Sequence, residues 1–301
     1  MESAARNSIE LKTNLRVYLE LAKLRIVLLL LFTTLTTMVI AADGVPPVGV
    51  LLPALVGGTL AAAGASTLNH YLDRDLDARM ARTARRPIPS GRVAPLHALA
   101  AGLAQMAVSV LILGVFVNWL TAALALIGGV YYVVVYTMLL KRNTVLNIVI
   151  GGGAGAIPVL VGWAAVTGGL ALDAWILFAI VFYWTPPHSW ALALLVNADY
   201  ARAGVPMMPV ARGEDATRRQ ILLYSALLLV VSLLPALTGT LGALYLVSAA
   251  LLGVGLVWYA IRLLRDASKA MARRTYKYST FYLALLFMAM MLDVLLSRVL
   301  S

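Results

Sequence analysis

The sequence predicts an all-α integral membrane protein with nine transmembrane helices. Of its 301 residues 62% are hydrophobic and only 12% are charged, and the mean hydropathy is +0.90. Such a composition does not fit a water-soluble domain, which needs a polar surface. The charged residues, moreover, gather between long apolar stretches, as they do in proteins that cross a membrane several times.

Segments free of Asp, Glu, Lys and Arg mark the helices in chain order. A spanning helix needs about 20 apolar residues, so the two longest segments must each hold two helices. Their breaks are expected near 117–120 ("VNWL") and 237–242 ("LTGTLG"). The segments are 26–42, 44–72, 93–140, 143–172, 174–198, 220–261 and 278–292. They predict nine helices in a single polytopic domain that covers residues 1–301.

The basic residues predict the orientation of the chain. All Lys and Arg except Arg298 lie in the N-terminal segment, which includes Arg6 and Lys12, or in alternate connections. Because such residues stay on the cytoplasmic side, we expect a cytoplasmic N-terminus in a multi-pass protein of the cell (inner) membrane. The cytoplasmic loops would cover about 73–96, 141–146, 197–219 and 262–277. The net charge of +11 then belongs to one membrane face, where it would attract anionic headgroups or an anionic substrate rather than nucleic acid. The absence of Cys excludes disulfides and thiolate metal sites.

The most polar stretch is "NHYLDRDLDARMARTARRPIPSGRV" at 69–93. Asn69, Asp73 and Asp77 recur every four residues, so in a helix they are neighbours on one face, about 6 Å apart along the axis. Carboxylates this close repel each other unless a cation joins them. Hard oxygen ligands suit Mg²⁺, which in proteins often also holds substrate phosphates, and Arg82, Arg85 and Arg86 could clamp a diphosphate. The alternative is a solvated loop in which Asp and Arg pair with each other.

An Asn-x-x-x-Asp-x-x-x-Asp motif at the end of the second of nine helices, followed by a basic loop, resembles the UbiA-type intramembrane prenyltransferases. Three further stretches resemble the branch of that family that farnesylates haem: "NIVIGGGAGAIPVLVGWAAVTG" (147–168), "WTPPHSWALAL" (184–194) and "DYARAGVPMMPV" (199–210). The resemblance implies a ring of nine helices and an Mg²⁺-dependent transferase. Its substrates would be farnesyl diphosphate and haem B, with farnesyl joined to a vinyl group and water added to give haem O.

The resemblance also assigns roles to residues of this chain. Metal binding, and with it catalysis, is expected at Asn69, Asp73, Asp77 and Asp199. The second Asp-rich motif of many relatives is incomplete here, because Ala203 stands four residues after Asp199, and the number of Mg²⁺ ions therefore stays open. Diphosphate contacts are expected from Arg82, Arg86, Lys141, Arg142 and Arg202.

Histidines are the natural candidates for contacts with haem. His188 lies in the sixth predicted helix, where Pro186 and Pro187 are expected to break the helix beside a cavity. His70, one step off the Asp motif, is the second candidate. The alternative for each is a packed polar residue bonded to a neighbouring helix. Asp293, late in the ninth helix, is expected to pair either with a nearby polar group or with Arg298.

Other functions predict other sequence features. A prenyltransferase acting on a quinone precursor or a chlorophyllide would be expected to carry a complete second Asp motif. A noncatalytic haem-handling membrane protein has no use for the metal stripe. A secondary transporter should hold its charges near the bilayer midplane. Beyond the lipid bilayer, the resemblance suggests a downstream haem A synthase or terminal oxidase assembly as partners.

Overall fold

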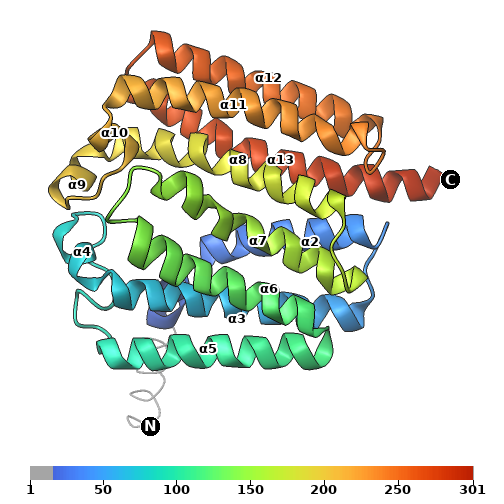
Figure 1. Ribbon diagram of the computed structural model, residues 1–301, viewed down its shortest axis with the longest axis horizontal. Coiled ribbons are helices and arrows are strands. Elements are labelled where there is room, and N and C mark those ends of the chain that lie inside the picture. The colour runs from blue at the N-terminus through green and yellow to red at the C-terminus, as the bar shows by residue number, and fades with distance from the viewer. Residues whose placement is uncertain (1–15, 301) are drawn as a thin grey trace, which may run out of the picture.

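The computed structural model describes residues 16–300, with side chains for residues 16–298. Arg6 and Lys12, on which the predicted orientation partly depends, lie outside the described residues. Every regular element of the described chain is a helix (Figure 1). The predicted all-α class is therefore confirmed.

Long helices lie side by side along the length of the molecule, and short helices gather at one end (Figure 1). The short ones are α4 (Arg74–Arg79), α9 (Asn197–Arg202) and α10 (Met208–Ala211). The long ones are α2 (Leu24–Ala41), α3 (Val48–Leu72), α5 (Pro95–Phe116), α6 (Trp119–Val130) continued by the π-helix η1 (Tyr131–Leu140), α7 (Asn147–Thr167), α8 (Leu172–Leu195), α11 (Glu214–Leu237), α12 (Ala243–Arg265) and α13 (Lys269–Leu300).

Eight helices of the described chain are long and apolar enough to cross a membrane, with α6 and η1 taken as one span. The remaining long helix, α8, has 24 residues but carries two prolines and a histidine in its second half. The long helices fall where the apolar segments predict them, with breaks after Phe116 and after Leu237. That all nine cross the membrane stays a prediction.

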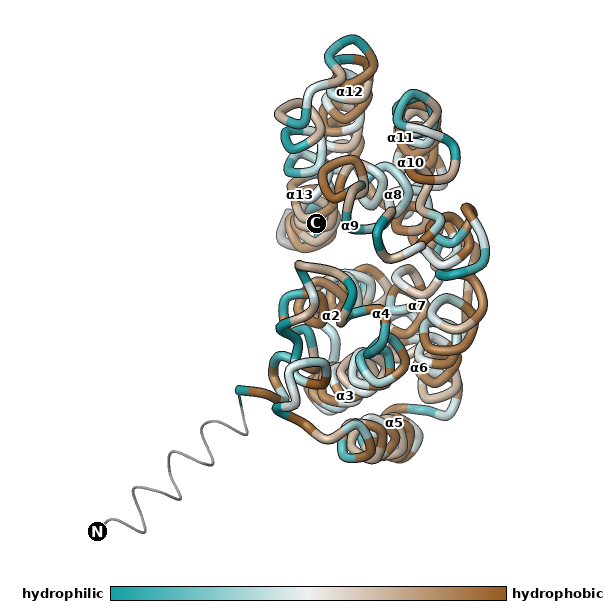
Figure 2. The backbone as a smooth tube through the Cα atoms, turned by 90° about the vertical axis from the view of Figure 1, so that its left-hand side faces the viewer, coloured by the Kyte–Doolittle hydropathy of each residue, from teal (hydrophilic) through white to brown (hydrophobic). Residues whose placement is uncertain are grey.

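The helices close into a ring because the first and last long helices meet. Helix α2 lies against α3, α7 and α13 (Figure 2). Near the end opposite the short helices, the Arg298 Nη2 atom lies 2.7 Å from the Asp43 Oδ2 atom, which links the C-terminal part of α13 to the turn after α2.

Small residues let these helices approach closely. A Cβ atom on Gly162 of α7 would lie 2.4 Å from the carbonyl oxygen of Thr34 in α2. The Thr34 hydroxyl in turn donates to the carbonyl oxygen of Pro158 at 3.1 Å. On the other side of the ring, Ser109 of α5 donates to the carbonyl oxygen of Gly57 in α3 at 2.7 Å. Close backbone approach and interhelical hydrogen bonds are the usual means of packing helices in lipid, where hydrophobic burial gives little gain.

Two local predictions differ from the structure. The predicted break at Pro186 and Pro187 is wrong, because α8 is continuous from Leu172 to Leu195. Each proline removes one backbone donor, but the packed neighbours of α8 keep the helix going. The segment 262–277, predicted as a loop, is helical except for residues 266–268, because α12 and α13 extend past their apolar stretches with charged turns.

Asp293 pairs with nearby polar groups, which is the first of the two alternatives that the sequence suggested. Its side chain is 8% exposed and accepts hydrogen bonds from the backbone N–H groups of Gly242 and Tyr245, the latter at 3.1 Å. These amides begin α12, whose first N–H groups have no partner within the helix. A carboxylate from α13 therefore caps α12, as N-terminal Asp residues commonly do within one helix.

Candidate active site

The Asn–Asp motif crosses the junction between α3 and α4. Asn69 lies in α3, Asp73 between the two helices and Asp77 in α4. The Asp73 N–H donates to the Asn69 carbonyl at 2.9 Å, and the Asp77 N–H donates to the Asp73 carbonyl at 2.7 Å. The helical four-residue spacing thus continues across the junction, and the three side chains keep to one stripe. Their exposure is 2%, 0% and 2%, so the stripe faces the interior.

Each buried carboxylate has a cationic partner from another part of the chain. Both oxygens of Asp77 lie 2.8 Å from the Arg86 Nη1 atom. Lys141 contacts Asp73, and the Arg142 Nη2 atom lies 3.4 Å from the Asp73 Oδ1 atom. Three of the five predicted diphosphate contacts, Arg86, Lys141 and Arg142, therefore touch the motif, and a fourth, Arg82, lies beside Tyr200 of α9.

Three residues that the sequence alone did not single out complete the motif's surroundings. The Lys23 Nζ atom donates to the Asn69 amide oxygen at 2.7 Å and lies 3.4 Å from the Tyr132 hydroxyl. The Asn69 amide nitrogen donates to Asp73 at 2.8 Å and to the Thr137 hydroxyl at 3.1 Å. The only sequence signal for Lys23 was its place at the start of the first apolar run.

The π-helix η1 supplies the wall opposite the motif. It carries Tyr132, Tyr136 and Thr137 and ends just before Lys141. The Thr137 hydroxyl donates to the Tyr132 carbonyl five residues earlier at 2.8 Å, and the rings of Tyr132 and Tyr136 stack with centroids 5.7 Å apart. Segments of π-helix are rare and often lie at functional sites. This one places the Thr137 hydroxyl against Asn69, and the residue after it, Lys141, contacts Asp73.

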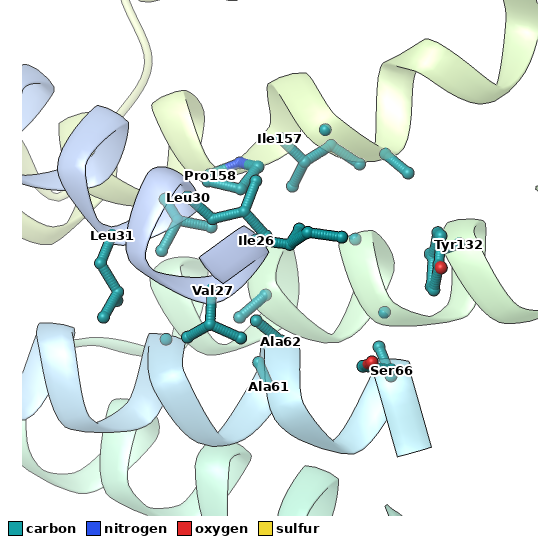
Figure 3. A pocket seen from close by; sticks show the side chains of 18 of the residues that line it. Ile26, Val27, Leu30, Leu31, Ala61, Ala62, Ser66, Tyr132, Ile157 and Pro158 are labelled. Atoms are coloured by element: carbon teal, nitrogen blue, oxygen red, sulfur yellow. The ribbon is translucent and has the colours of Figure 1, made fainter. Parts of the chain in front are cut away.

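An apolar cavity of about 210 Å³ opens beside the motif. Ile26 and Leu30 of α2, Ala61 of α3 and Ile157 of α7 line its wall (Figure 3). Other lining residues come from α6 and η1, and the polar groups are few: Lys23, Thr34, Ser66 and Tyr132. Because Lys23 also bonds to Asn69, it joins the polar motif to the apolar cavity.

The second half of the predicted metal site is not joined to the first. Asp199 of α9 pairs with Arg202 three residues later. Within residues 16–298, no three His, Cys, Asp or Glu side chains gather as a metal site. Arg82 and Arg86 lie close enough to Tyr200 to oppose the rise in its pKa that burial causes. The segment after α4, which carries these arginines, therefore lies near α9.

The two histidines predicted to contact haem are both inside the helix bundle but differ in their partners. The Nδ1 atom of His188 lies 2.9 Å from the Ser279 hydroxyl, and its ring stacks on Trp184 with centroids 4.3 Å apart. His70 is 2% exposed, and neither of its ring nitrogens has a hydrogen-bond partner within the described chain. A buried imidazole without a partner is costly, which makes His70 the more unusual of the two.

Positive charge exceeds negative charge around the motif. The cations Lys23, Arg86, Lys141 and Arg142 contact the amide of Asn69 and the carboxylates of Asp73, Asp75 and Asp77. Burial, with Arg86 and Lys141 nearby, lowers the pKa of Lys23 to about 7. The hydrogen bond from Arg142 lowers the pKa of the exposed Asp75 to about 2. An anionic ligand bound near Lys23 would raise the pKa of that lysine again. The site therefore favours an anionic ligand.

Comparison with known proteins places the chain in a family. Residues 30–290 match the UbiA prenyltransferase family. A protein from Symbiobacterium thermophilum named protoheme IX farnesyltransferase is 52% identical over 98% of this chain and 99% of its own length. A protein of the same name from Roseiflexus castenholzii is 53% identical over 93% of this chain. The chain spans about half of that second relative, 52% of its length.

Solved structures of low sequence identity share the fold. A digeranylgeranylglyceryl phosphate synthase superposes with a TM-score of 0.78 at 18% identity, over 93% of this chain and 98% of that one. A UbiA homologue from Archaeoglobus fulgidus, solved with DMAPP and Mg²⁺, gives 0.67 at 15% identity over 91% and 98% of the two chains. These structures and the apolar helices make the chain a multi-pass membrane protein. It belongs to the UbiA prenyltransferase family, as its Asn–Asp motif indicated, and within that family its sequence groups with proteins named protoheme IX farnesyltransferase.

Proposed function

We propose that this protein transfers the farnesyl group of farnesyl diphosphate to a vinyl group of haem B, with addition of water, to give haem O. In this reaction the bond between C1 of farnesyl and the diphosphate oxygen breaks, and the vinyl group forms a bond to C1. A water oxygen then adds to the other vinyl carbon and loses a proton. The products are haem O, diphosphate and one proton.

The observation that carries the proposal is the buried motif with its cations at the end of an apolar cavity. An isoprenyl diphosphate has the same two parts, a strongly anionic head and an apolar tail. The tail would leave lipid for an apolar cavity and so gain little free energy on binding. The affinity would therefore come from the head, through charge-assisted hydrogen bonds from Arg86, Lys141, Arg142 and Lys23, with Arg82 and Arg202 further along the same end.

The residues present fit Mg²⁺. This ion commonly binds through one or two carboxylates, with waters and substrate phosphates completing its shell. Asp73 and Asp77 would supply the carboxylates and Asn69 an amide oxygen, whereas Asp199 would require a rearrangement of its pair with Arg202. When bound, the ion would neutralise charge on the leaving diphosphate. Lys141 and Arg86, which now neutralise these carboxylates, would then be available to the diphosphate.

The aromatic wall would protect the reactive carbon. Tyr132 lines the cavity and is stacked on Tyr136. As the C1–O bond breaks, positive charge develops on the allylic carbons, and the face of an aromatic ring stabilises a nearby cation. The surrounding apolar side chains would exclude bulk water until the vinyl group attacks.

The named relatives support haem B as the acceptor. The solved structures share only the fold and do not bear on the choice of acceptor. His70 and His188 would be its contacts in this chain. The unpartnered ring of His70 favours a ligand at that position, whereas the bond from His188 to Ser279 leaves the Nε2 atom as the free nitrogen of His188. The single-domain organisation, the inner membrane and the cytoplasmic position of the motif belong to the same proposal, as do a haem A synthase or an oxidase assembly as partners.

Mass spectrometry of haem extracted from membranes tests the reaction. The chain would be expressed in a host that lacks its own enzyme, with farnesyl diphosphate and Mg²⁺ supplied. We expect a haem heavier by one farnesyl group plus water, absent when Mg²⁺ is chelated. Unmodified haem together with a prenylated quinone precursor would instead assign a different acceptor within the same family.

A further inference from the structure

A cationic stripe on α13 lies outside the site described above. Lys269, Arg273, Arg274 and Lys277 line an open groove of about 400 Å³ on the first turns of this helix. All four are exposed, and they extend over roughly 12 Å of helix at 1.5 Å per residue. The stripe lies at the end of the molecule that holds α4 and α9 (Figure 1).

None of the four cations of the stripe forms an ion pair within the described chain, although, after the hydrogen bond from Ser268, the charge of Arg274 helps to lower the pKa of the exposed Asp266. The only acidic residue of the segment 262–277 is Asp266, which accepts a hydrogen bond from the Ser268 N–H at 3.0 Å. Seven other cations at the same end do pair with carboxylates: Arg16, Arg86, Arg92, Lys141, Arg142, Arg202 and Arg218. Four like charges on one helix face repel each other, so the stripe would be stabilised by an external anion.

The same face of α13 continues into an exposed apolar surface. Lys277 is followed at intervals of three or four residues by Phe281, Leu285, Met288 and Leu292, which therefore share its face. Phe281 is 63% exposed and Leu285 is 50% exposed. The helix thus presents a cationic segment and then an apolar one, in the order in which a lipid presents its headgroup and its acyl chain.

We propose that this face of α13 binds an anionic phospholipid, with the phosphate between Arg273, Arg274 and Lys277 and an acyl chain along Phe281 and Leu285. The site is separate from the proposed prenyl-transfer site, and its occupant is part of the bilayer. Charge complementarity supports an anionic over a zwitterionic headgroup, because basic residues at the membrane surface attract net negative charge.

Native mass spectrometry of the full chain in detergent tests this site, with phosphatidylglycerol and phosphatidylcholine of matched acyl chains as probes. We expect tighter binding of phosphatidylglycerol. The double variant Arg273→Gln/Arg274→Gln should weaken that binding about tenfold and leave phosphatidylcholine unchanged. The variant Arg273→Lys/Arg274→Lys should keep most of it, which would show that charge rather than folding is at issue.

A matched control removes two charges from the same end of the molecule. Arg212→Gln/Arg219→Gln, on exposed residues outside the stripe, should change phosphatidylglycerol binding by less than about twofold. Equal binding of the two lipids by the unmodified chain, or an equal loss in the control, would overturn the proposal. Displacement of phosphatidylglycerol by equimolar inorganic diphosphate would also overturn it, because the groove would then select a free diphosphate.

Discussion

The substitution Asp73→Asn tests the centre of the proposed site. Asp73 is fully buried and contacts Lys141, Arg142 and Asn69. Removing one partner of a buried ion pair costs about 3–5 kcal/mol. The side chains of Lys141 and Arg142 are 14% and 37% exposed, so both can turn toward water, and we expect a cost at the lower end, about 3 kcal/mol. Prenyl transfer should fall by at least about 10³-fold, since a ligand at the reacting charge is lost.

Two further variants separate folding from catalysis. Asp73→Asn/Lys141→Gln removes the unpaired cation and should recover part of the stability but none of the activity. Asp75→Asn makes the same charge change two residues away, at a side chain that is 50% exposed, and should cost less than about 1 kcal/mol. Thermal unfolding in detergent and haem extraction measure the two effects. Full activity of Asp73→Asn, or recovery of activity in the double variant, would refute the assignment of Asp73.

Four other substitutions examine the cavity, the helix packing, the cap and the haem contact. Gly155 lines the cavity and a Cβ there meets no atom within 4 Å, so Gly155→Leu should block farnesyl transfer with little change in unfolding temperature; unchanged kinetics would mean that the tail lies elsewhere. Gly162→Ala places a methyl group against the α2 backbone and should destabilise the protein by about 1–3 kcal/mol, measured by thermal unfolding. Asp293→Ala leaves two amides of α12 uncapped and should cost about 1–2 kcal/mol while the activity per folded molecule is kept. His188→Ala should alter the Soret band of added haemin, and an identical spectrum would remove His188 as a ligand.

Local patterns predicted the parts of the site that lie close together in the chain. The spacing of Asn69, Asp73 and Asp77 is a property of one helix, and the structure keeps it across the α3–α4 junction. Lys23, by contrast, is 46 residues from Asn69, and no periodicity within a helix indicates which distant lysine completes a motif. For Asp199 the local pattern is misleading instead. Its motif indicates a metal ligand, whereas in the structure its partner is Arg202, three residues later.

The proline pair shows why a sequence rule can fail inside a bundle. Pro186 and Pro187 each remove a donor from α8, and in water such a pair commonly ends a helix. Here Trp184 donates from its indole to the Ser279 carbonyl of α13 at 2.7 Å, and Thr185 donates to the Val181 carbonyl at 2.9 Å. The Trp184 bond before the prolines and the contact of His188 with the Ser279 hydroxyl after them both join α8 to α13 and hold it in place. These two contacts are not readable from the local sequence.

The π-helix makes the site sensitive to chain length. In η1 the backbone bonds join residues five apart, one more than in an α-helix, and the Thr137 hydroxyl likewise bonds to the Tyr132 carbonyl five residues earlier. Loss of a single residue between them would allow ordinary α-helical bonds, and the helix on one side of the deletion would rotate by about 100° relative to the other. Tyr132 and Thr137 could then no longer face Lys23 and Asn69 together. A deletion that improves the regularity of the backbone would thereby misalign the two halves of the polar site.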